Sequence, residues 1–124
     1  MFRLRDFEGN LTLSLYSFNL GLRGEEYSLI MTILRKIRAI TYIQIKSELE
    51  THFQTMPEDK LQKTLKDLQA ARSVEYKDNC YYLTALGITN ADLIISLSKA
   101  GIRDTTLDEK VRRFFESINV YMKK

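Results

Sequence analysis

Several residue types that mark particular kinds of site are scarce in this sequence. Cysteine, histidine and proline each occur once among the 124 residues, and tryptophan is absent. The single cysteine, Cys80, excludes an intramolecular disulfide, so nothing indicates an oxidising compartment. Because Cys80 lies in a predicted strand, away from any helix N-terminus that would lower its pKa, we interpret it as a small packed thiol rather than a nucleophile.

The lone histidine, His52, excludes a metal site built from several histidines and leaves one possible base for a histidine-dependent triad. We interpret His52 as a surface or boundary side chain at the end of a predicted helix. A glycine-rich phosphate loop and a Cys-x-x-Cys pair are also absent. The sequence therefore predicts a protein that is not an enzyme and that holds neither a metal ion nor another cofactor.

Long apolar runs are missing as well. The longest candidates, such as LIISL at 93–97, are far shorter than the roughly 18 residues that are needed to cross a bilayer. The opening residues, MFRLRDFEGN, lack the apolar region of a signal peptide. We therefore expect a cytoplasmic protein that has no membrane partner.

The composition is that of a folded globular chain. With 44% hydrophobic and 28% charged residues, it differs from a disordered tail. Its length suits a single domain, 1–124, with one hydrophobic core. The net charge of +3 is compatible with a polyanionic partner but does not require one.

One repeated pattern marks the starts of helices. In a capping box, a Ser or Thr side chain accepts a bond from the backbone N–H three residues on, where an acid or amide reaches back. Together with helical apolar spacing, this pattern predicts helices over 41–50, 56–71 and 106–122, and a further one that follows a turn at 84–88. The capping pairs are Thr41 with Gln44, Thr55 with Glu58, Thr89 with Asp92, and Thr106 with Glu109.

Two more features complete the helical prediction. A first helix is expected over 25–39, where Glu25 and Glu26 suit the positive end of the helix dipole. In the helix that follows residue 88, Leu93, Leu97 and Ala100 fall on one face, and Gly101 suits a position just past the helix end.

Two β-hairpins are predicted. At 73–83, the segments SVEY and CYYL are rich in β-forming residues and flank the short turn Lys77-Asp78-Asn79. At 1–22, alternating apolar residues shift phase between Leu15 and Tyr16, which indicates a bulge or a strand that is covered on both faces.

The order of these elements, with particular residues inside them, resembles a known family. The leucines Leu61, Leu65 and Leu68 precede Val74 and the closing segment YLTALG at 82–87. Over residues 25–88 this arrangement resembles the winged helix-turn-helix regulators of the PadR and MarR type. One departure is that Ala71-Arg72-Ser73 stands where those proteins usually have a glycine before the wing.

The resemblance implies a winged helix-turn-helix core over residues 25–88. Together with the N-terminal β-hairpin (1–22) and the C-terminal helices (89–124) predicted from the sequence pattern, it gives an expected α+β, mainly α fold. It also implies a transcriptional regulator that binds double-stranded DNA, with the 56–71 helix in the major groove and the 73–83 wing on the backbone. Carried over by position, the DNA-contacting residues would be Lys60, Gln62, Lys63, Thr64 and Lys66 on that helix, Lys77 and Asn79 at the wing tip, and Gln44, Lys46 and Ser47 on the 41–50 helix.

The distribution of charge supports an alternative. Residues 25–55 hold four basic and four acidic residues, and residues 56–88 hold five of each. On the 56–71 helix, Asp59 with Lys63 and Lys63 with Asp67 have the i,i+4 spacing of ion pairs on a solvated surface. A winged-helix module that binds another protein, or a subunit of a complex, therefore stays open beside DNA binding.

The last helix carries an apolar stripe with spacings of 4, 3, 4 and 3, the rhythm of a helix–helix seam. We predict from it a homodimer, while the alternative is that the stripe packs onto the first helix of the same chain. The residues proposed for dimerisation are Leu107, Val111, Phe114, Phe115, Ile118 and Tyr121.

Overall fold

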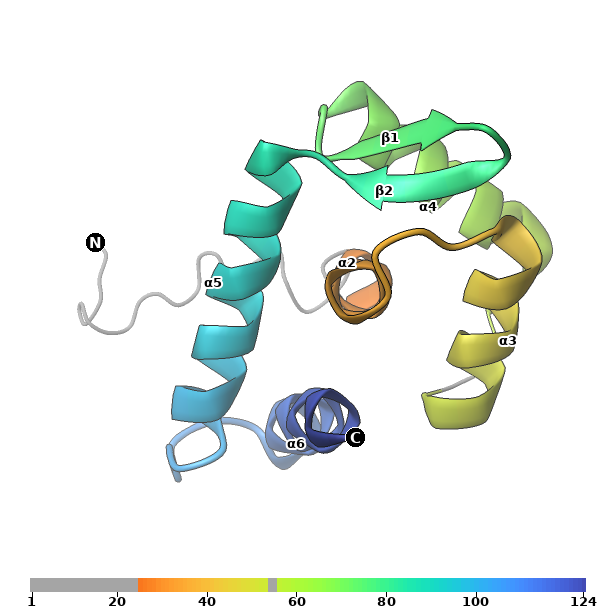
Figure 1. Cartoon of the computed structure of the whole chain (residues 1–124). Coiled ribbons are helices and arrows are strands. Elements are labelled where there is room, and N and C mark those ends of the chain that lie inside the picture. The colour runs from red at the N-terminus through yellow and green to blue at the C-terminus, as the bar shows by residue number, and fades with distance from the viewer. Residues whose placement is uncertain (1–24, 54–55) are drawn as a thin grey trace.

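The computed structural model describes residues 25–53 and 56–124 (Figure 1). Within these ranges it contains five helices and one antiparallel hairpin, which confirms the mainly helical α+β class. The predicted N-terminal hairpin at 1–22 lies outside the described residues. The elements in chain order are α2 (Glu25–Lys36), α3 (Tyr42–His52), α4 (Glu58–Ala70), β1 (Val74–Lys77), β2 (Cys80–Leu83), α5 (Ala85–Gly101) and α6 (Glu109–Lys123).

Helix α2 lies at the centre of the protein, and the other elements surround it (Figure 1). Every residue from Ser28 to Leu34 is buried. The buried Thr32 hydroxyl finds its hydrogen-bond partner on the same helix, since it donates to the Ser28 carbonyl oxygen at 2.7 Å. Burial on all sides makes α2 the core against which the rest of the chain folds.

Helices α3 and α4 follow the sequence prediction closely. The Thr41 hydroxyl oxygen accepts from the backbone N–H of Gln44 at 3.2 Å, and the Thr41 N–H donates to Gln44 Oε1 at 2.9 Å, which completes the predicted capping box. Helix α4 begins at Glu58, slightly later than expected. Its N-cap is Pro57, which makes no side-chain cap bond, so the predicted start at a Thr55–Glu58 capping box is wrong. Its leucine ladder, Leu61, Leu65 and Leu68, is buried as predicted.

The hairpin is short and is attached to the core through β2. Asp78 and Asn79 have φ angles of 54° and 66°, the left-handed values that a two-residue type I′ turn requires. Ile40, between α2 and α3, forms an isolated antiparallel bridge with Tyr81 of β2. The Tyr81 N–H donates to the Ile40 carbonyl oxygen at 2.8 Å, and the Ile40 N–H donates back at 3.3 Å. This bridge fixes the hairpin beside the α2–α3 segment.

A compact junction joins the exit of α4 to the start of α5. Thr84 is the N-cap of α5, and its hydroxyl oxygen accepts from the Gly87 N–H at 3.0 Å. The same hydroxyl donates to the Arg72 carbonyl oxygen at 2.7 Å, and the Thr84 N–H donates to the Ser73 carbonyl oxygen at 3.0 Å. A Cβ at Gly87 would lie 2.0 Å from that Ser73 oxygen, far inside van der Waals contact distance. The Leu-Thr-x-x-Gly pattern is thus required by the packing of this junction.

Several predicted details of α5 and α6 are wrong. Thr89 and Asp92 lie inside α5 rather than at its start. Gly101 is the last residue of α5 instead of a position past its end, and it faces the ring of Phe115 on α6. Helix α6 begins at Glu109, where the Asp108 side chain accepts from the Lys110 N–H in place of the predicted Thr106 cap.

The apolar stripe of α6 packs within the chain, as the alternative reading proposed. Ile118 is fully buried, Tyr121 is 3% exposed, and Leu107, Val111, Phe114 and Phe115 are partly buried. Helix α6 contacts α2 and α5 of its own chain. Ile118 and Tyr121 are therefore covered by intramolecular contacts and the other four residues are partly covered, and the homodimer stays a prediction.

Tyr121 connects α6 to both α2 and α3. Its hydroxyl donates to Glu48 Oε1 on α3 at 2.7 Å, and its backbone carbonyl oxygen accepts from Lys36 Nζ on α2 at 2.6 Å. Its ring lies 5.1 Å from that of Phe53, centroid to centroid. Burial, together with the bond to Glu48, raises the pKa of Tyr121 well above its usual value.

We expect the substitution Gly87→Ala to lower the free energy of unfolding by at least about 2 kcal/mol, because the backbone carbonyl of Ser73 cannot move aside. Gly101→Ala is the matched control, since its Cβ meets the ring of Phe115, a side chain that can shift. Urea denaturation of both variants measures the difference. Equal losses would contradict the role assigned to the junction.

We expect Tyr121→Phe to lower the free energy of unfolding by about 1–2 kcal/mol, because Glu48 loses a partly buried hydrogen-bond donor. Tyr76→Phe is the control, since the Tyr76 hydroxyl bonds Asn79 on an exposed side chain and should contribute under about 0.5 kcal/mol. Thermal and urea unfolding compare the two, and similar effects would argue against Tyr121 as a connecting residue.

Candidate nucleic-acid interface

The outward face of α4 changes character along its length. Its first turn carries the acids Glu58 and Asp59, which complement the positive end of the helix dipole. From residue 62 onward, every exposed side chain is either neutral or basic. The exposed residues of this stretch are Gln62, Lys63, Lys66, Gln69, Ala70, Ala71 and Arg72. We refer to Gln62, Lys63, Lys66, Gln69 and Arg72 as the basic strip.

The one acid in this stretch, Asp67, is drawn toward the protein. Its Oδ2 accepts from the Tyr27 hydroxyl on α2 at 3.0 Å and from Lys63 Nζ at 3.2 Å. The contact with Tyr27 holds the carboxylate on the inner flank of α4. Lys63 is partly neutralised by this contact, although its own side chain is 73% exposed.

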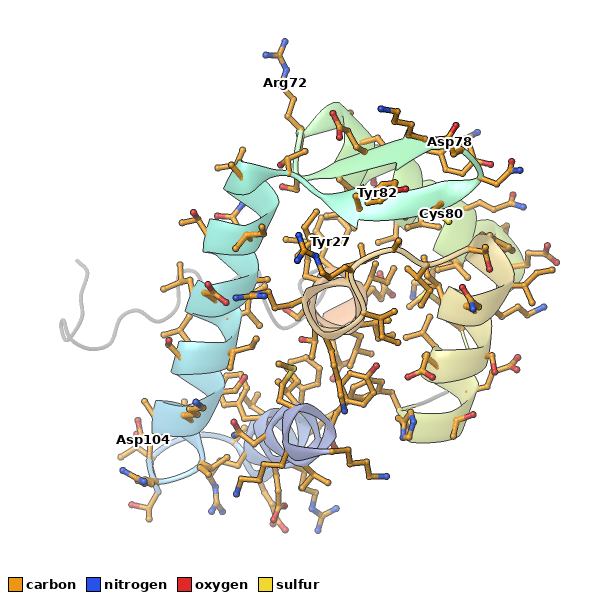
Figure 2. All side chains as sticks on the ribbon, viewed as in Figure 1. Tyr27, Arg72, Asp78, Cys80, Tyr82 and Asp104 are labelled. Carbon is orange, nitrogen blue, oxygen red and sulfur yellow. The ribbon has the colours of Figure 1, made fainter. Side chains whose placement is uncertain are left out.

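Arg72 extends the strip beyond the end of α4 (Figure 2). Its backbone has φ of 65°, in the left-handed region where glycine is favoured. The Arg72 N–H donates to the Gln69 carbonyl oxygen and the Ser73 N–H donates to the Leu68 carbonyl oxygen, each at 3.0 Å. These two bonds form a Schellman motif with arginine at its left-handed position. Arginine therefore occupies the site where the family resemblance led us to expect glycine.

Two of the predicted α4 contacts are engaged within the chain: Thr64 is buried, whereas Lys60 is exposed but forms an ion pair. Thr64 is 3% exposed, and its hydroxyl donates to the Lys60 carbonyl oxygen at 2.8 Å, so we remove it from the set of surface contacts. Lys60 forms an ion pair with Glu26 of α2, and this hydrogen bond and the glutamate's charge raise the pKa of Lys60. Gln62, Lys63 and Lys66 do lie on the exposed face, as predicted.

The predicted contacts outside α4 are mixed. On α3, Gln44 is committed to the capping box with Thr41, Lys46 is partly buried and Ser47 is exposed. In the hairpin, Lys77 is exposed, and Asn79 forms the turn with its Oδ1 accepting from the Tyr76 hydroxyl at 3.2 Å. The tip of the hairpin also carries an acid, Asp78 (Figure 2).

Sequence reasoning missed Gln69 and Arg72. Gln69 is found by following the exposed helical positions one turn past Lys66. In the sequence, only the missing glycine pointed to Arg72. The left-handed backbone of this arginine is seen in the structure, where the end of α4 is fixed.

Charge on the surrounding surface is nearly balanced. Residues 42–83, which include α3, α4 and the hairpin, contain six basic and seven acidic residues. The basic strip is therefore a local feature, and long-range attraction to a polyanion would be weak.

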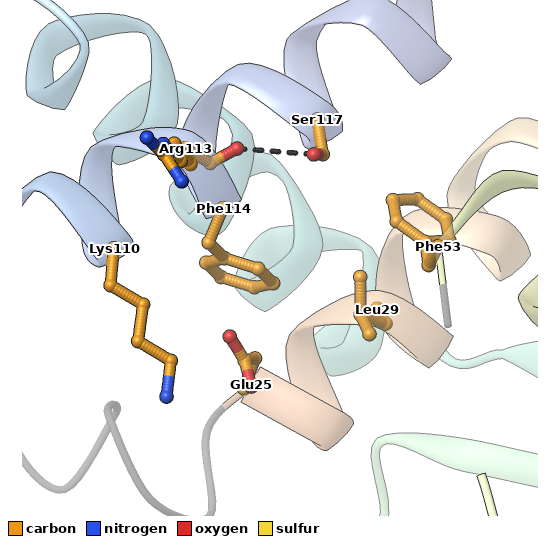
Figure 3. A pocket seen from close by; sticks show the side chains of 7 residues that line it. All are labelled: Glu25, Leu29, Phe53, Lys110, Arg113, Phe114 and Ser117. Carbon is orange, nitrogen blue, oxygen red and sulfur yellow. Dashed lines mark hydrogen bonds between the residues drawn. The ribbon is translucent and has the colours of Figure 1, made fainter. Parts of the chain in front are cut away.

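A separate cavity of about 150 Å³ lies between the start of α2 and α6 (Figure 3). Glu25 of α2 and Lys110, Arg113 and Phe114 of α6 contribute to its lining. Its volume is below the roughly 300–1,000 Å³ of ordinary small-molecule sites. We therefore assign it no ligand.

The described ranges contain no group of three or more His, Cys, Asp or Glu side chains that could hold a metal ion. None of the helices in residues 25–53 and 56–124 is long and apolar enough to span a membrane. Comparison of the chain with protein-family models, curated proteins and solved structures finds no match. The arguments for a function therefore come from the geometry.

We expect Arg72→Gly to raise the free energy of unfolding by about 1 kcal/mol, because glycine adopts the left-handed conformation without steric strain. Arg72→Ala is the matched control, since it removes the same guanidinium group but keeps a Cβ at this position. Urea unfolding distinguishes them. A gain in both variants would attribute the effect to charge and would contradict the backbone explanation.

Proposed function

We propose that this chain is a winged helix-turn-helix protein that binds duplex DNA, as a transcriptional regulator would. The order of elements supports this proposal: α2, the Ile40 bridge, α3, α4 and then the β1–β2 hairpin. In that arrangement α3 and α4 form the helix-turn-helix, and the hairpin is the wing.

The observation that carries the proposal is the basic strip. Three cations and two glutamines occupy consecutive exposed turns of α4 and its exit, and the one acid among them, Asp67, is about one-third exposed and bonded to Tyr27 and Lys63. Lysine and arginine neutralise phosphates, and glutamine can pair with the major-groove edge of adenine. The small side chains of Ala70 and Ala71 let the backbone of α4 approach a groove closely.

The strip also limits the expected strength of binding. Three phosphate contacts give a slope of roughly −2.7 for log affinity against log salt, about −0.9 for each contact. Binding by a single chain should therefore be weak at physiological ionic strength and readily measured at low salt.

A second candidate is supported by the balanced charge of residues 42–83. A winged-helix module that docks on another protein needs no excess of positive charge on α4. In this alternative the strip is one polar part of a mixed protein-binding surface.

The two candidates differ in a binding measurement with a mixed-sequence DNA duplex. We expect fluorescence anisotropy to give an affinity that falls with salt, and Lys66→Ala to reduce the magnitude of the salt slope by about 1. Lys99→Ala is the matched control, because Lys99 is an exposed lysine on α5, outside the strip.

Failure of the folded protein to bind duplex at low salt would contradict DNA binding and leave the protein-docking candidate. If Lys66→Ala and Lys99→Ala reduced the slope equally, the basic strip would be contradicted as the DNA-binding site, because binding would then depend on total charge.

A further inference from the structure

The unpaired positive charge of the basic strip lies in the second half of α4 and at its exit. Lys66 and Arg72 are both exposed, and neither forms an ion pair with another described residue. Lys63, one turn before Lys66, shares its charge with Asp67, since their side chains are 3.2 Å apart. The cations that remain for a phosphate therefore stand at the end of the helix.

The opposite end of α4 is acidic. Glu58 and Asp59 are exposed in its first turn, and Lys60 beside them is committed to its ion pair with Glu26. Helix-turn-helix proteins usually present the N-terminal residues of the corresponding helix to the bases. Two carboxylates in that turn would be repelled by the phosphates on both sides of the groove, so this end of α4 is poorly suited to enter it.

The tip of the hairpin adds no net positive charge, because Lys77 and Asp78 are neighbours there and both are exposed. Figure 2 shows Arg72 and Asp78 at opposite ends of the hairpin. At the exit, the first turn of α5 carries no acid. One acid, Glu75, follows in β1, on the face of the strand opposite to the buried Val74. The exit therefore keeps a net positive charge, which neither the first turn of α4 nor the hairpin tip has.

The shape of the exit also suits a groove. The fully exposed residues between Lys66 and Arg72 are Gln69, Ala70 and Ala71, so one long side chain projects between the two cations. The carboxamide of Gln69 has a donor and an acceptor, which match N7 and N6 of adenine in the major groove. Lys66 and Arg72 are about 9 Å apart along the axis at 1.5 Å per residue, and their long side chains extend this span toward the roughly 12 Å width of the groove.

On the premise that the proposed function is right, we propose that duplex DNA is bound at the exit of α4, where Gln69 reads an adenine and Lys66 and Arg72 hold phosphates on the two sides of the major groove. The left-handed backbone of Arg72, fixed by the two bonds of the Schellman motif, gives its guanidinium group a defined position beside Gln69. A span of about 9 Å corresponds to roughly three base pairs at about 3.4 Å each, so one chain should read a short site.

Selection from a randomised duplex library at low salt tests the reading of a base. We expect the unaltered chain to enrich sites with one fixed adenine. Gln69→Ala should lose that preference, worth about 5- to 150-fold in affinity, without changing the salt slope. Gln62→Ala is the comparison variant, because Gln62 is an exposed glutamine on the same flank of α4, two turns nearer its start, and its effect should be smaller.

The salt slope and the acids of the first turn test the position of the duplex. Arg72→Ala should reduce the magnitude of the slope by about 1, and Arg72→Lys should keep it. The double variant Glu58→Gln with Asp59→Asn should change affinity by less than about twofold at 0.15 M salt, because these groups lie about 10 Å or more from Lys66 and the screening length is about 8 Å.

Three outcomes would overturn the assignment to the exit: no base preference in the unaltered chain, a larger loss for Gln62→Ala than for Gln69→Ala, or a salt slope that Arg72→Ala leaves unchanged. A gain of about tenfold or more in the double variant would place the first turn in the groove and would overturn it as well. All of these side chains are exposed, and circular dichroism verifies that each variant is folded.

Failure of the proposed function has a different signature. It is the absence of any duplex binding by the folded chain at low salt, and it would remove the exit assignment with it. Binding that depends on Lys66 but on neither Gln69 nor Arg72 would keep the proposed function and contradict only the exit.

Discussion

The complete burial of α2 is the constraint on which the rest of this structure depends. Its seven buried residues, from Ser28 to Leu34, can be covered only if several elements approach from different directions. Helices α3, α4, α5 and α6 and strand β2 supply that cover. Each of these elements packs an apolar face against α2, and its outward face is left for contacts with other molecules. The polar ends of α2 serve these neighbours as well, since Glu26 pairs with Lys60 and Lys36 bonds Tyr121.

The junction of Arg72, Ser73, Thr84 and Gly87 fixes two surfaces at once. It ends α4 with a left-handed arginine, and so places a guanidinium group at the end of the basic strip. It also begins α5 against the Ser73 carbonyl, which sets the direction and rotation of that helix. The rotation brings Gly87, Ala91 and Ser98 inward and leaves Leu86 and Leu93 outside. The end of the basic strip and the rotation of α5 are thus both fixed by one set of backbone contacts.

Local signals in the sequence were reliable where a single interaction decides the structure. The Thr41–Gln44 capping box, the Leu61–Leu65–Leu68 ladder and the Asp78-Asn79 turn all depend on residues close together in the chain. The leucine spacing of α4 also predicted correctly that Gln62, Lys63 and Lys66 lie on its exposed face, because helical periodicity is a local property. The predictions failed where a distant partner decides, as for Thr64, which is buried. Lys60 is exposed, but the sequence did not indicate its ion pair because the partner, Glu26, lies on another helix.

The sequence by itself determined the order of elements from α2 to β2, because capping, turn chemistry and leucine spacing act over a few residues. Only the tertiary structure decided which faces of α5 and α6 are covered. Helix α5 has large apolar residues on one side and small ones on another, so its hydrophobic pattern alone could not select the inner face. Close approach to the Ser73 carbonyl selected the small side, since Gly87 fits where a Cβ would collide with backbone. For α6, the same apolar rhythm would suit a helix of a second chain or of its own chain, and in the structure α6 packs against α2 and α5 of its own chain.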